Sequence, residues 1–570
     1  MASTHVEQRR TWWLWLDRSV LALLLATLFL LPFERPAPLF SAAGLVVTNL
    51  EALALLTVAV WLVRLVLSPP RSFHVPYFTW PAAAIIVSAC LAALAASSFQ
   101  LTAWKVTARW SLGIVFALAL ADTLRRTRAA RQAFSAIVLG ALAAAVLGLM
   151  ELVGVSWVGS ILTLFKDAPA QLGAAVRLSA TFGSANTAAM LFETALCLAL
   201  GLALDAAYRR RRLAQMTWAA CLVLLAAALA LTYSRGGIAA AAVGVAVACG
   251  LAATRMKGLD GRALALTTLG MAVVVAAVLA LNPVLRARLA VWDSRPMDAA
   301  SIAAPATLTA DGGSILPVTV SATNTGRLTW AADGPESVAL SYHWLTEDRL
   351  GVAEWDNARL ALPADVSPGG TATLHPELVA PVAGRYALAW DLVHAPDEWL
   401  GTRDAMPGWT EVVTSGSGGT PFPPASAGRT PEPPPDRGVL WRAALQMARE
   451  RPILGVGPGN FRHLYGQYLG AATWDDRILA NNLYLEILAD VGLIGLAAWA
   501  WLFVAAVSHL WRRRKAEQAW PYAIALLAAL AAWLTHGLFD VAFETTGVYM
   551  LLWALIGLAA SLDVEPDVRS

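Results

Sequence analysis

The chain has 570 residues, of which 58% are hydrophobic and only 14% are charged, and its formal net charge is +3. Soluble domains carry about 25% charged residues, so this composition excludes an ordinary soluble enzyme, a disordered chain and a disulfide-rich secreted module. The four cysteines all lie in long apolar stretches and form no CxxC pair, so we expect neither a disulfide framework nor a zinc site. Many membrane spans with one soluble insertion fit the composition better.

Twelve apolar stretches are long enough to be membrane spans, which need about 20 mostly apolar residues each. The fold class that they predict is an all-α polytopic membrane protein of about 12 transmembrane helices. Nine spans fall in a first membrane domain, residues 1–285, and three in a second, residues 483–570. The predicted spans are 14–33, 42–67, 77–96, 104–121, 133–153, 187–206, 214–232, 236–253, 263–281, 483–510, 520–536 and 547–562.

The charges in the loops predict the orientation of the chain. If the N-terminus is cytoplasmic, the cytoplasmic segments hold 21 Lys and Arg residues and the short outer loops hold five. Because Lys and Arg accumulate on the cytoplasmic side, we expect both termini in the cytoplasm and the stretch between the ninth and tenth spans outside it. ATP and nucleotide sugars are absent there, which favours a donor that is already activated on a lipid.

The outer insertion begins with a segment, residues 300–412, of alternating apolar and polar residues separated by Gly, Pro, Asn and Asp turns. This pattern predicts about seven short strands in an immunoglobulin-like β-sandwich without disulfides. Residues 301–412 hold 14 acidic side chains, five Arg and no Lys, which argues against nucleic acid as a partner. Its tryptophans either stack on sugars or fill the sandwich core. The clearest strand patterns are Ile315–Ala322, Ser337–Trp344, Ala372–Leu378 and Tyr386–Val393.

Two further segments complete the insertion. Residues 413–437 are rich in Gly, Ser and Pro and predict a linker. Residues 438–482 predict outer-loop helices, beginning with an amphipathic helix at 438–450 that a Gly-rich turn follows at Gly455–Gly459. This turn lacks the lysine of a P-loop and the strand and helix of a dinucleotide fold, so we expect no nucleotide there.

Two arginines occur at the outer ends of predicted spans. Arg235 follows Ser234 where the seventh span ends, and Arg177 opens the segment before the sixth span. Arginine beside lipid is unfavourable unless it reaches the interface or meets an anion. Two such arginines can hold a diphosphate through forked, charge-assisted hydrogen bonds, although each can equally be an interfacial anchor.

Polar residues also open the tenth span. Asn481 and Asn482 lie near its N-terminus, where free backbone N–H groups and the helix dipole favour an anion. Glu486 and Asp490 are four residues apart and therefore share one face of the helix. Because acids facing lipid are unfavourable, we expect this face to turn into the bundle.

Three segments resemble the O-antigen ligase and polymerase superfamily of bacterial envelope glycosyltransferases. They are "LALTYSRGG", which ends at Gly237, "RLSATFGSAN", which runs from Arg177 to Asn186, and "RPILGVGPGNF…NNLYLEILADVGLIGL", which closes the large outer loop. The order of these segments and the layout of the spans are similar too. The resemblance covers roughly residues 100–285 and 437–562, and the sandwich is an addition to it.

The resemblance implies glycan transfer on the outer face of the bacterial cytoplasmic (inner) membrane. The donor would be an undecaprenyl-diphosphate-linked oligosaccharide, the acceptor a glycan, a lipid or a protein, and neither a cofactor nor a metal would be needed. Arg177 and Arg235 correspond to arginines that hold the diphosphate, and two fixed guanidinium groups would stabilise this leaving group. Asn186 and Ser234 lie in the same motifs.

One position departs from the ligase pattern. Family ligases carry a His followed by Asn, nine residues and Gly-x-x-Gly; here Asn482, Gly492 and Gly495 fit, but Asn481 replaces the His. Asparagine cannot act as a general base. Asn481 therefore only orients the acceptor, or another group removes the proton, or this subgroup has a different acceptor or no activity. The side chains that could supply another base are His463, Asp475, Asp476 and Glu486.

His536 and Asp540 form a second candidate pair at the outer end of the eleventh span. They are four residues apart, resemble a pair found in the superfamily's polymerases, and serve either the substrate or the structure. Glu193, a lone acid in the sixth span, is expected to point into the bundle, where an arginine is a possible partner.

Two other functions compete with a polymerase or ligase. The first is a flippase or secondary transporter, although the sequence shows no clear repeat halves and its ionisable residues lie mostly at span ends. The second is an inactive protein whose sandwich binds glycan. Membrane lipids are expected partners in each case.

Overall fold

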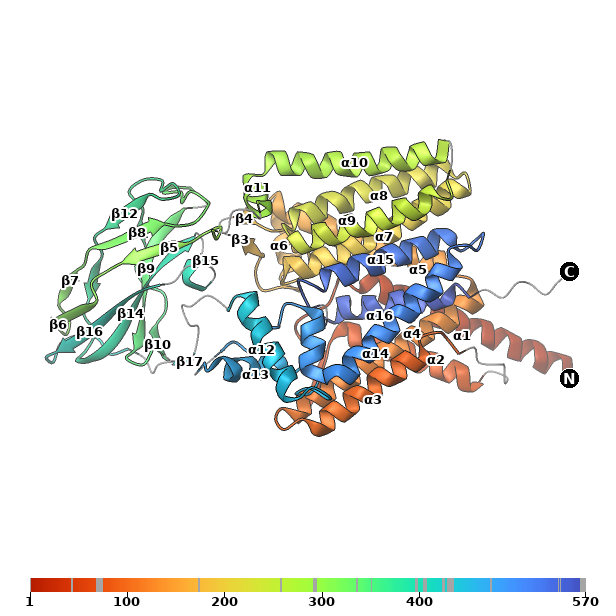
Figure 1. Ribbon diagram of the computed structural model, residues 1–570, viewed down its shortest axis with the longest axis horizontal. Helices are drawn as coiled ribbons and strands as arrows, with labels where there is room; N and C mark the ends of the chain where they lie inside the picture. The colour runs from red at the N-terminus through yellow and green to blue at the C-terminus, as the bar shows by residue number, and fades with distance from the viewer. Residues whose placement is uncertain are drawn as a thin grey trace. The chain divides into compact units, whose positions relative to one another are not determined.

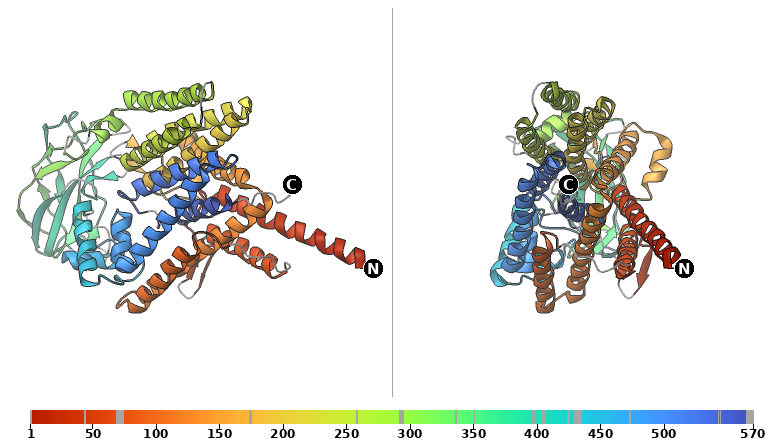
Figure 2. Two further views of the ribbon diagram at one scale, coloured as in Figure 1. Left: turned by 45° about the vertical axis from the view of Figure 1, so that its right-hand side comes forward. Right: turned by 90° about the vertical axis from the view of Figure 1, so that its right-hand side faces the viewer.

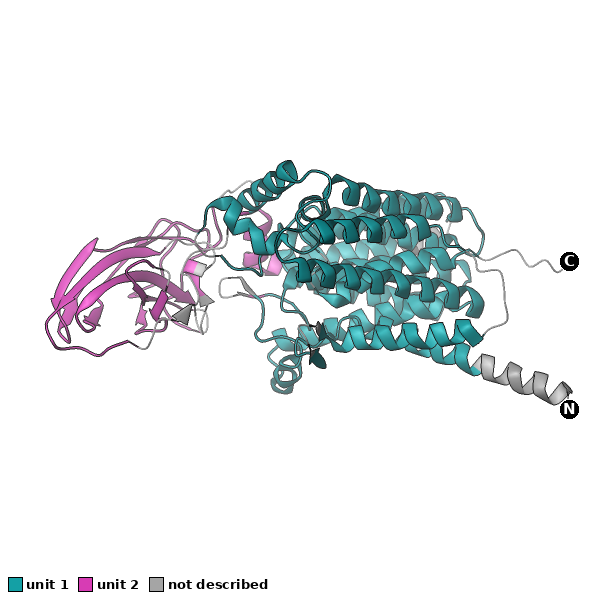
Figure 3. Ribbon diagram, turned by 90° about the horizontal axis from the view of Figure 1, so that it is seen from below, with its two compact units in different colours: residues 1–170, 177–279, 437–570 teal, residues 171–176, 280–436 magenta. Residues whose placement is uncertain are grey.

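The computed structural model describes the chain in two compact units (Figure 3). The helical unit comprises residues 1–170, 177–279 and 437–570, and the β unit comprises residues 171–176 and 280–436. Each unit has a hydrophobic core of its own. The description leaves out residues 1, 43–44, 68–74, 173–174, 257–258, 291–294, 335–336, 350, 395–397, 403–406, 423–425, 428–434, 472–473, 542, 544 and 564–570.

The helical unit is a bundle of long helices with three short ones and one hairpin (Figure 1). The short helices are α6 (Ser156–Leu162), α12 (Arg437–Glu450) and α13 (Phe461–Leu469), and the hairpin pairs β1 (Phe40–Ala42) with β2 (Leu45–Val47). The long helices are α1 (Ala2–Leu30), α2 (Asn49–Leu67), α3 (Thr79–Ala95), α4 (Gln100–Thr127), α5 (Ala130–Leu152), α7 (Ala185–Tyr208), α8 (Arg212–Leu231), α9 (Arg235–Ala253), α10 (Leu259–Leu281), α14 (Leu483–Arg513), α15 (Trp520–His536) and α16 (Thr546–Ser561).

Seven of the described helices are long and apolar enough to cross a membrane: α2, α4, α5, α7, α8, α9 and α14. Four shorter apolar helices lie at Thr79–Ala95, Ala265–Leu281, Trp520–His536 and Thr546–Ser561. Each predicted span overlaps a helix, so the predicted membrane protein is confirmed, whereas a total of about 12 spans stays a prediction. The predicted span 42–67 begins too early, because Ala42 and Leu45–Val47 belong to the β1–β2 hairpin and α2 starts at Asn49. Both views of Figure 2 show the helices of this unit packed side by side.

Helix α7 is the centre of the bundle. Its side chains are almost all buried, and it packs against α5, α8, α9 and α15. Small residues permit this packing: Gly201 lies against Ala525 and the backbone of Pro521 on α15. The acid Glu193 therefore lies in an almost fully enclosed helix, where an unpaired charge would be costly.

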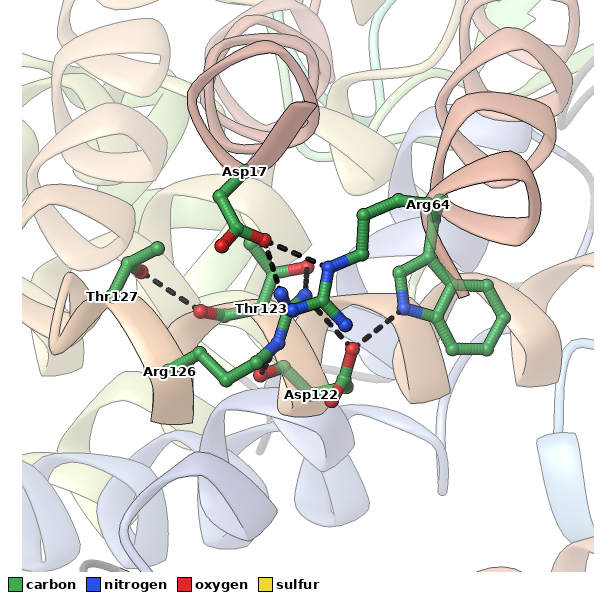
Figure 4. Close-up of polar contacts among 7 residues, drawn as sticks. Asp17, Arg64, Asp122, Thr123, Arg126 and Thr127 are labelled. Atoms are coloured by element: carbon green, nitrogen blue, oxygen red, sulfur yellow. Dashed lines mark hydrogen bonds and ion pairs between the residues drawn. The ribbon is translucent and has the colours of Figure 1, made fainter. Parts of the chain in front are cut away.

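Charged side chains join α1, α2 and α4 (Figure 4). The Asp17 carboxylate on α1 accepts from Arg64 Nε on α2 at 2.8 Å and also pairs with Arg126 on α4. Asp122 accepts from Arg126 at 2.9 Å and from the indole N–H of Trp61 at 2.8 Å. Because each acid serves two donors, this network fixes three helices together.

Helix α14 breaks at Gly492, whose φ of 64° and ψ of −166° are not helical. The break frees backbone groups that bind the Gly-rich turn predicted at residues 455–459. Val456 N donates to Ala489 O and Gly457 N to Asp490 O, both at 2.9 Å. A side chain at position 492 would collide with the backbone of Ile453, so glycine is required there for its conformation and for this close approach. The turn thereby positions the first half of α14.

The β unit consists of two larger sheets. One has the strand order β17-β10-β9-β14-β16-β6, with β11 and β15 at its sides, and the other has the order β12-β8-β5. A separate pair joins β13 to β7. The strands are β5 (Ala300–Ala303), β6 (Thr307–Asp311), β7 (Ile315–Pro317), β8 (Val320–Asn324), β9 (Val338–Thr346), β10 (Gly351–Glu354), β11 (Leu360–Ala361), β12 (Thr371–Leu374), β13 (Glu377–Val379), β14 (Gly384–His394), β15 (Glu398–Trp399), β16 (Gly408–Ser415) and β17 (Ser426–Ala427).

The two larger sheets share one core. Val320 and Leu374 from one sheet pack with Leu388 and Trp390 from the other. Trp330 and Trp390 are fully buried. These two tryptophans therefore fill the sandwich core and are not exposed for stacking on sugars. The Tyr386 hydroxyl donates to Val382 O at 3.1 Å and fixes the turn before β14.

Several predicted boundaries in the β unit differ from the structure. The segment Ile315–Ala322 forms two strands, β7 and β8, and Ala372–Leu378 divides into β12 and β13. Prolines end the pairing, because Pro317 and Pro376 have no N–H to donate. Strand β16 extends to Ser415, and β17, in the segment predicted to be a linker, pairs with β10.

Candidate functional site

The segment that precedes α7 is fixed at several points. Leu178 N donates to Leu231 O at 2.9 Å. The buried Lys166 ammonium donates to Glu151 at 2.7 Å and to the Ser179 hydroxyl at 2.9 Å. Burial lowers the pKa of Lys166, and the Glu151 carboxylate opposes this shift. These contacts hold the Arg177 backbone in one place.

The Arg177 side chain lies against the end of α8. Its Nε donates to Thr232 O at 2.8 Å, and a terminal nitrogen donates to Asn186 Oδ1 at 2.9 Å. Ser184 caps α7 by accepting from Asn186 N. The predicted motif residues Arg177 and Asn186 are therefore in direct contact.

Arg235 is the first residue of α9. Ser234 caps this helix, because its hydroxyl accepts from Gly237 N at 3.2 Å. Arg235 is exposed and lies three residues after Thr232, so their Cα atoms are at most about 11 Å apart. Since Thr232 O accepts from Arg177, both predicted arginines lie near the N-terminus of α9.

Glu193 and His536 form a buried pair. His536 Nδ1 lies 2.8 Å from Glu193 Oε2, and the two side chains are 1% and 0% exposed. The partner of Glu193 is therefore a histidine of α15 and not an arginine. A Cβ at Gly236 would lie 3.5 Å from His536 Nε2, so this ring nitrogen faces the residue that follows Arg235. The described residues offer no hydrogen-bond partner to Nε2.

The start of α14 adjoins the same place. Leu483 N donates to Gly537 O at 2.8 Å, and Asn482 Nδ2 donates to Leu538 O at 3.2 Å. Asn482 also caps α14 through Tyr484 N and Leu485 N. Asn481 is half-buried and has a positive φ of 50°, a conformation that asparagine adopts more readily than most residues. The family His position, Asn481, is thus two residues before Leu483, which bonds to the residue that follows His536.

Glu486 and Asp490 are both buried, and their predicted inward face is confirmed. Glu486 Oε2 accepts from Ala480 N at 2.7 Å. Asp490 accepts from Gly459 N at 2.6 Å and from Phe461 N at 3.0 Å. Asp490 therefore fixes the Gly-rich turn, and Glu486 fixes the chain just before Asn481.

Three other predicted residues are Asp540, which interacts with the His–Glu pair, and His463 and Asp475, which lie on and after α13. Asp540 interacts electrostatically with both Glu193 and His536. His463 is on α13, where its Nδ1 lies 3.6 Å from Asp476 and its ring stacks on Phe99. Burial lowers the pKa of His463. Asp475 pairs with Arg477, which lowers the pKa of Asp475.

Sequence reasoning missed three features. It did not pair Glu193 with His536, because 343 residues separate them. It overlooked Arg437, an exposed residue at the start of α12 that interacts electrostatically with His536. It also missed a cavity of about 680 Å³ beside α4 and α14, which Arg109, His463 and Glu486 help to line. The position of Arg437 at a helix start was the one available signal.

In the described part of the chain, no group of three or more His, Cys, Asp or Glu side chains could hold a metal ion. The candidate site consists of two arginines, a His–Glu pair and the amide-rich start of α14.

Comparisons with known proteins agree with one predicted motif. No curated protein matches the chain. Among solved structures, Pseudomonas fluorescens alkylpurine DNA glycosylase AlkC, bound to DNA containing an abasic site analog, aligns at 11% identity over 59% of this chain and 98% of its own. Its TM-score of 0.14 carries no conclusion. Residues 426–500, which contain α12, α13 and the start of α14, match the O-antigen ligase family model. The predicted relation to the O-antigen ligase superfamily is thereby confirmed.

Proposed function

We propose that the protein transfers glycan from a lipid diphosphate to an acceptor, as a polymerase or ligase of surface polysaccharide. The observation that carries this proposal is the hydrogen bond from Arg177 to Thr232 O, beside Arg235. Two guanidinium groups at one helix N-terminus suit a diphosphate, which accepts forked hydrogen bonds and carries high negative charge. The donor of this proposal is an undecaprenyl-diphosphate-linked oligosaccharide.

The site faces the outside of the bacterial inner membrane in this proposal. Its residues lie at the starts of α7, α9 and α14 and at the end of α15. The loop charges assign these ends to the outer side, and the chain termini to the cytoplasm. A donor on this side carries its activation with it, so the reaction needs no nucleotide.

The proposed step forms one bond and breaks another. The oxygen of an acceptor hydroxyl attacks the anomeric carbon of the donor sugar, while the bond from that carbon to the phosphate oxygen breaks. The electron pair of this bond leaves with the diphosphate, and Arg177 and Arg235 stabilise the added charge. The hydroxyl proton passes to a base.

His536 is the base that the geometry favours. Asn481 cannot take a proton, and His536 adjoins the same segment through Gly537. Glu193 binds Nδ1 and leaves Nε2 to accept the proton beside Gly236. A carboxylate that orients a histidine in this way also stabilises the imidazolium that forms. Asn481 then orients the acceptor hydroxyl.

The β unit has an accessory role in this proposal. We assign residues 300–412 to an immunoglobulin-like sandwich, supported by the bond from Tyr386 to Val382, which resembles the tyrosine corner of such folds. Its two fully buried tryptophans, Trp330 and Trp390, lie in its core, and the reaction is assigned to the helical unit.

Purified protein tests the proposal directly. We expect the wild type, in membranes, to transfer glycan from an undecaprenyl-diphosphate-linked oligosaccharide to an acceptor. Substitution Arg235→Ala should abolish transfer at an unchanged protein level, whereas Arg211→Ala, at an exposed position at the other end of the bundle, should not. Transport of the lipid-linked glycan without transfer would favour a flippase, and unchanged transfer by Arg235→Ala would refute the clamp.

A further inference from the structure

Arg437 is an arginine of the helical unit that the proposed transfer step does not use. It is the first residue of α12, and its side chain is exposed. No described residue forms a hydrogen bond or an ion pair with its guanidinium group. Other arginines of this unit have acidic partners, since Arg64 pairs with Asp17 at 2.8 Å and Arg109 with Glu51 at 3.0 Å. Arg437 is therefore a cation that can serve an anionic ligand.

The first turn of α12 is fixed against the chain that leads into α14. Trp441 lies four residues after Arg437 and hence on the same face of α12. Its indole N–H donates to Ala480 O at 3.0 Å. Leu440 and Ala480 also belong to one buried cluster. Because Ala480 directly precedes Asn481, the start of α12 adjoins the family His position.

The same part of the molecule contains His536. The start of α14 is joined to the end of α15, where His536 lies, by two hydrogen bonds. Arg437 interacts electrostatically with His536. On α9, a Cβ at Gly236 would lie 3.5 Å from His536 Nε2, and Gly236 directly follows Arg235. Arg437 and the start of α9, which carries Arg235, therefore both lie beside this histidine.

The proposed step changes the charge of the diphosphate. In the bound donor, each phosphate is linked on two sides and carries one ionised oxygen. When the bond to the anomeric carbon breaks, its electron pair stays on the phosphate oxygen, and the acceptor proton goes to His536. The phosphate that loses the sugar becomes a terminal one, which carries about −1.5 to −2 at pH 7. A cation that meets this added charge raises kcat, because it acts more strongly in the transition state than in the bound donor.

We propose that Arg437 is a third binding group for the diphosphate, and that it meets the charge that appears as the glycan leaves. Arg177 and Arg235 hold the donor, and the guanidinium group of Arg437 joins them as the bond to the sugar breaks. This inference rests on the proposed function and adds to it a residue from the outer-loop helix α12. The released lipid diphosphate then binds Arg437 more strongly than the glycan-bearing donor does.

Binding in lipid nanodiscs tests the inference independently of transfer. The two probes are undecaprenyl diphosphate and the same lipid diphosphate carrying its oligosaccharide. Arg437→Ala should weaken binding of undecaprenyl diphosphate about tenfold, as expected for one charge-assisted hydrogen bond, and should weaken binding of the glycan-bearing lipid much less. Arg437→Lys, which keeps the charge, should recover part of the loss.

The matched control is Arg442→Ala, an exposed arginine five residues further along α12 and on another face. This variant should bind both probes as the wild type does. Equal weakening of both probes by Arg437→Ala, or wild-type binding of undecaprenyl diphosphate by that variant, would overturn the inference.

Transfer kinetics provide a second measurement. Arg437→Ala should lower kcat about 10–100-fold and leave KM for the donor nearly unchanged, because the lost interaction belongs to the transition state. Arg442→Ala should transfer at the wild-type rate. A raised KM with an unchanged kcat in Arg437→Ala would overturn the inference. Absence of transfer by the wild type, with binding of undecaprenyl diphosphate still dependent on Arg437, would refute only the proposed function.

Discussion

Each of the two units buries a histidine beside a carboxylate, but the two pairs differ in what surrounds them. In the β unit, Asp391 accepts from Leu392 N at 2.7 Å and from Gly401 N at 2.8 Å, and lies 3.4 Å from His343 Nε2. The His343 ring stacks on Trp355 and its Nδ1 contacts Trp355 O. Both nitrogens of this ring and both oxygens of the acid therefore have partners.

The pair in the helical unit is incomplete. Glu193 Oε1 is buried without a hydrogen-bond partner in the described part of the chain, and His536 Nε2 faces Gly236. Buried polar groups are normally satisfied, and an exception calls for an explanation. The two pairs are alike in burial and in combining a histidine with a carboxylate. They differ in that the Glu193–His536 pair keeps unused hydrogen-bonding capacity, whereas the Asp391–His343 pair does not.

The largest expected effect is on transfer. We expect His536→Gln to lower kcat by about 10²–10⁴, the usual contribution of a general base, because glutamine keeps the shape but takes no proton. Transfer from the lipid-linked donor by purified variants measures this effect. His343→Gln is the matched control and should leave transfer unchanged; equal losses in both variants would remove the distinction between the pairs.

A third buried carboxylate, Asp490, should behave as a structural group. Asp490→Ala leaves Gly459 N and Phe461 N without their acceptor, so we expect a loss of about 2–5 kcal/mol in stability. Thermal unfolding of the full chain in detergent measures this loss. Asp490→Asn, which retains one acceptor oxygen, should recover part of it, and wild-type stability of the alanine variant would contradict the assigned role.

The stability of the β unit is expected to depend on pH through Asp391, the acid of the structural pair. Burial raises the pKa of Asp391 above 3.8, while His343, Gly401 and Leu392 oppose the shift. The folded state therefore holds this proton more tightly than the unfolded state, so its stability falls as pH rises from 3.8 through the raised pKa. Hydrogen exchange of β9 and β14 amides, corrected for intrinsic rates, should show this fall in the wild type.

The control variants for this measurement are Asp391→Asn and Asp333→Asn. The first should remove the pH-dependent fall, because asparagine does not titrate. The second, at an exposed turn, should keep it. A wild-type slope that persists in Asp391→Asn would assign the effect to another group.

The smallest expected effect concerns the turn before β14. Tyr386→Phe removes only the hydroxyl that donates to Val382 O, so we expect a loss of about 1 kcal/mol in stability. Hydrogen exchange of β14 amides measures this loss, and transfer should not change. A loss of transfer would show that the β unit contributes to the reaction.

The sequence alone was sufficient to predict the helices and several of the motifs. Long apolar stretches must become helices in a membrane, because each buried N–H and C=O has to be satisfied within its own segment. The caps Ser184, Ser234 and Asn482 act on backbone groups two or three residues away, so local pattern indicates them. The strand breaks at Pro317 and Pro376 were equally local, although the alternating pattern concealed them.

The composition and order of the residues thus determined that this chain is a membrane protein, where its motifs lie and that a β-rich segment interrupts it. Only the tertiary structure decided which motifs meet: Arg177 with the start of α9, Glu193 with His536, and α14 with the end of α15. Helix periodicity fixes the face on which a side chain lies, but the neighbour of that face depends on packing between segments hundreds of residues apart. A hydrogen bond needs its partners within about 3 Å, and that proximity is a property of the folded chain.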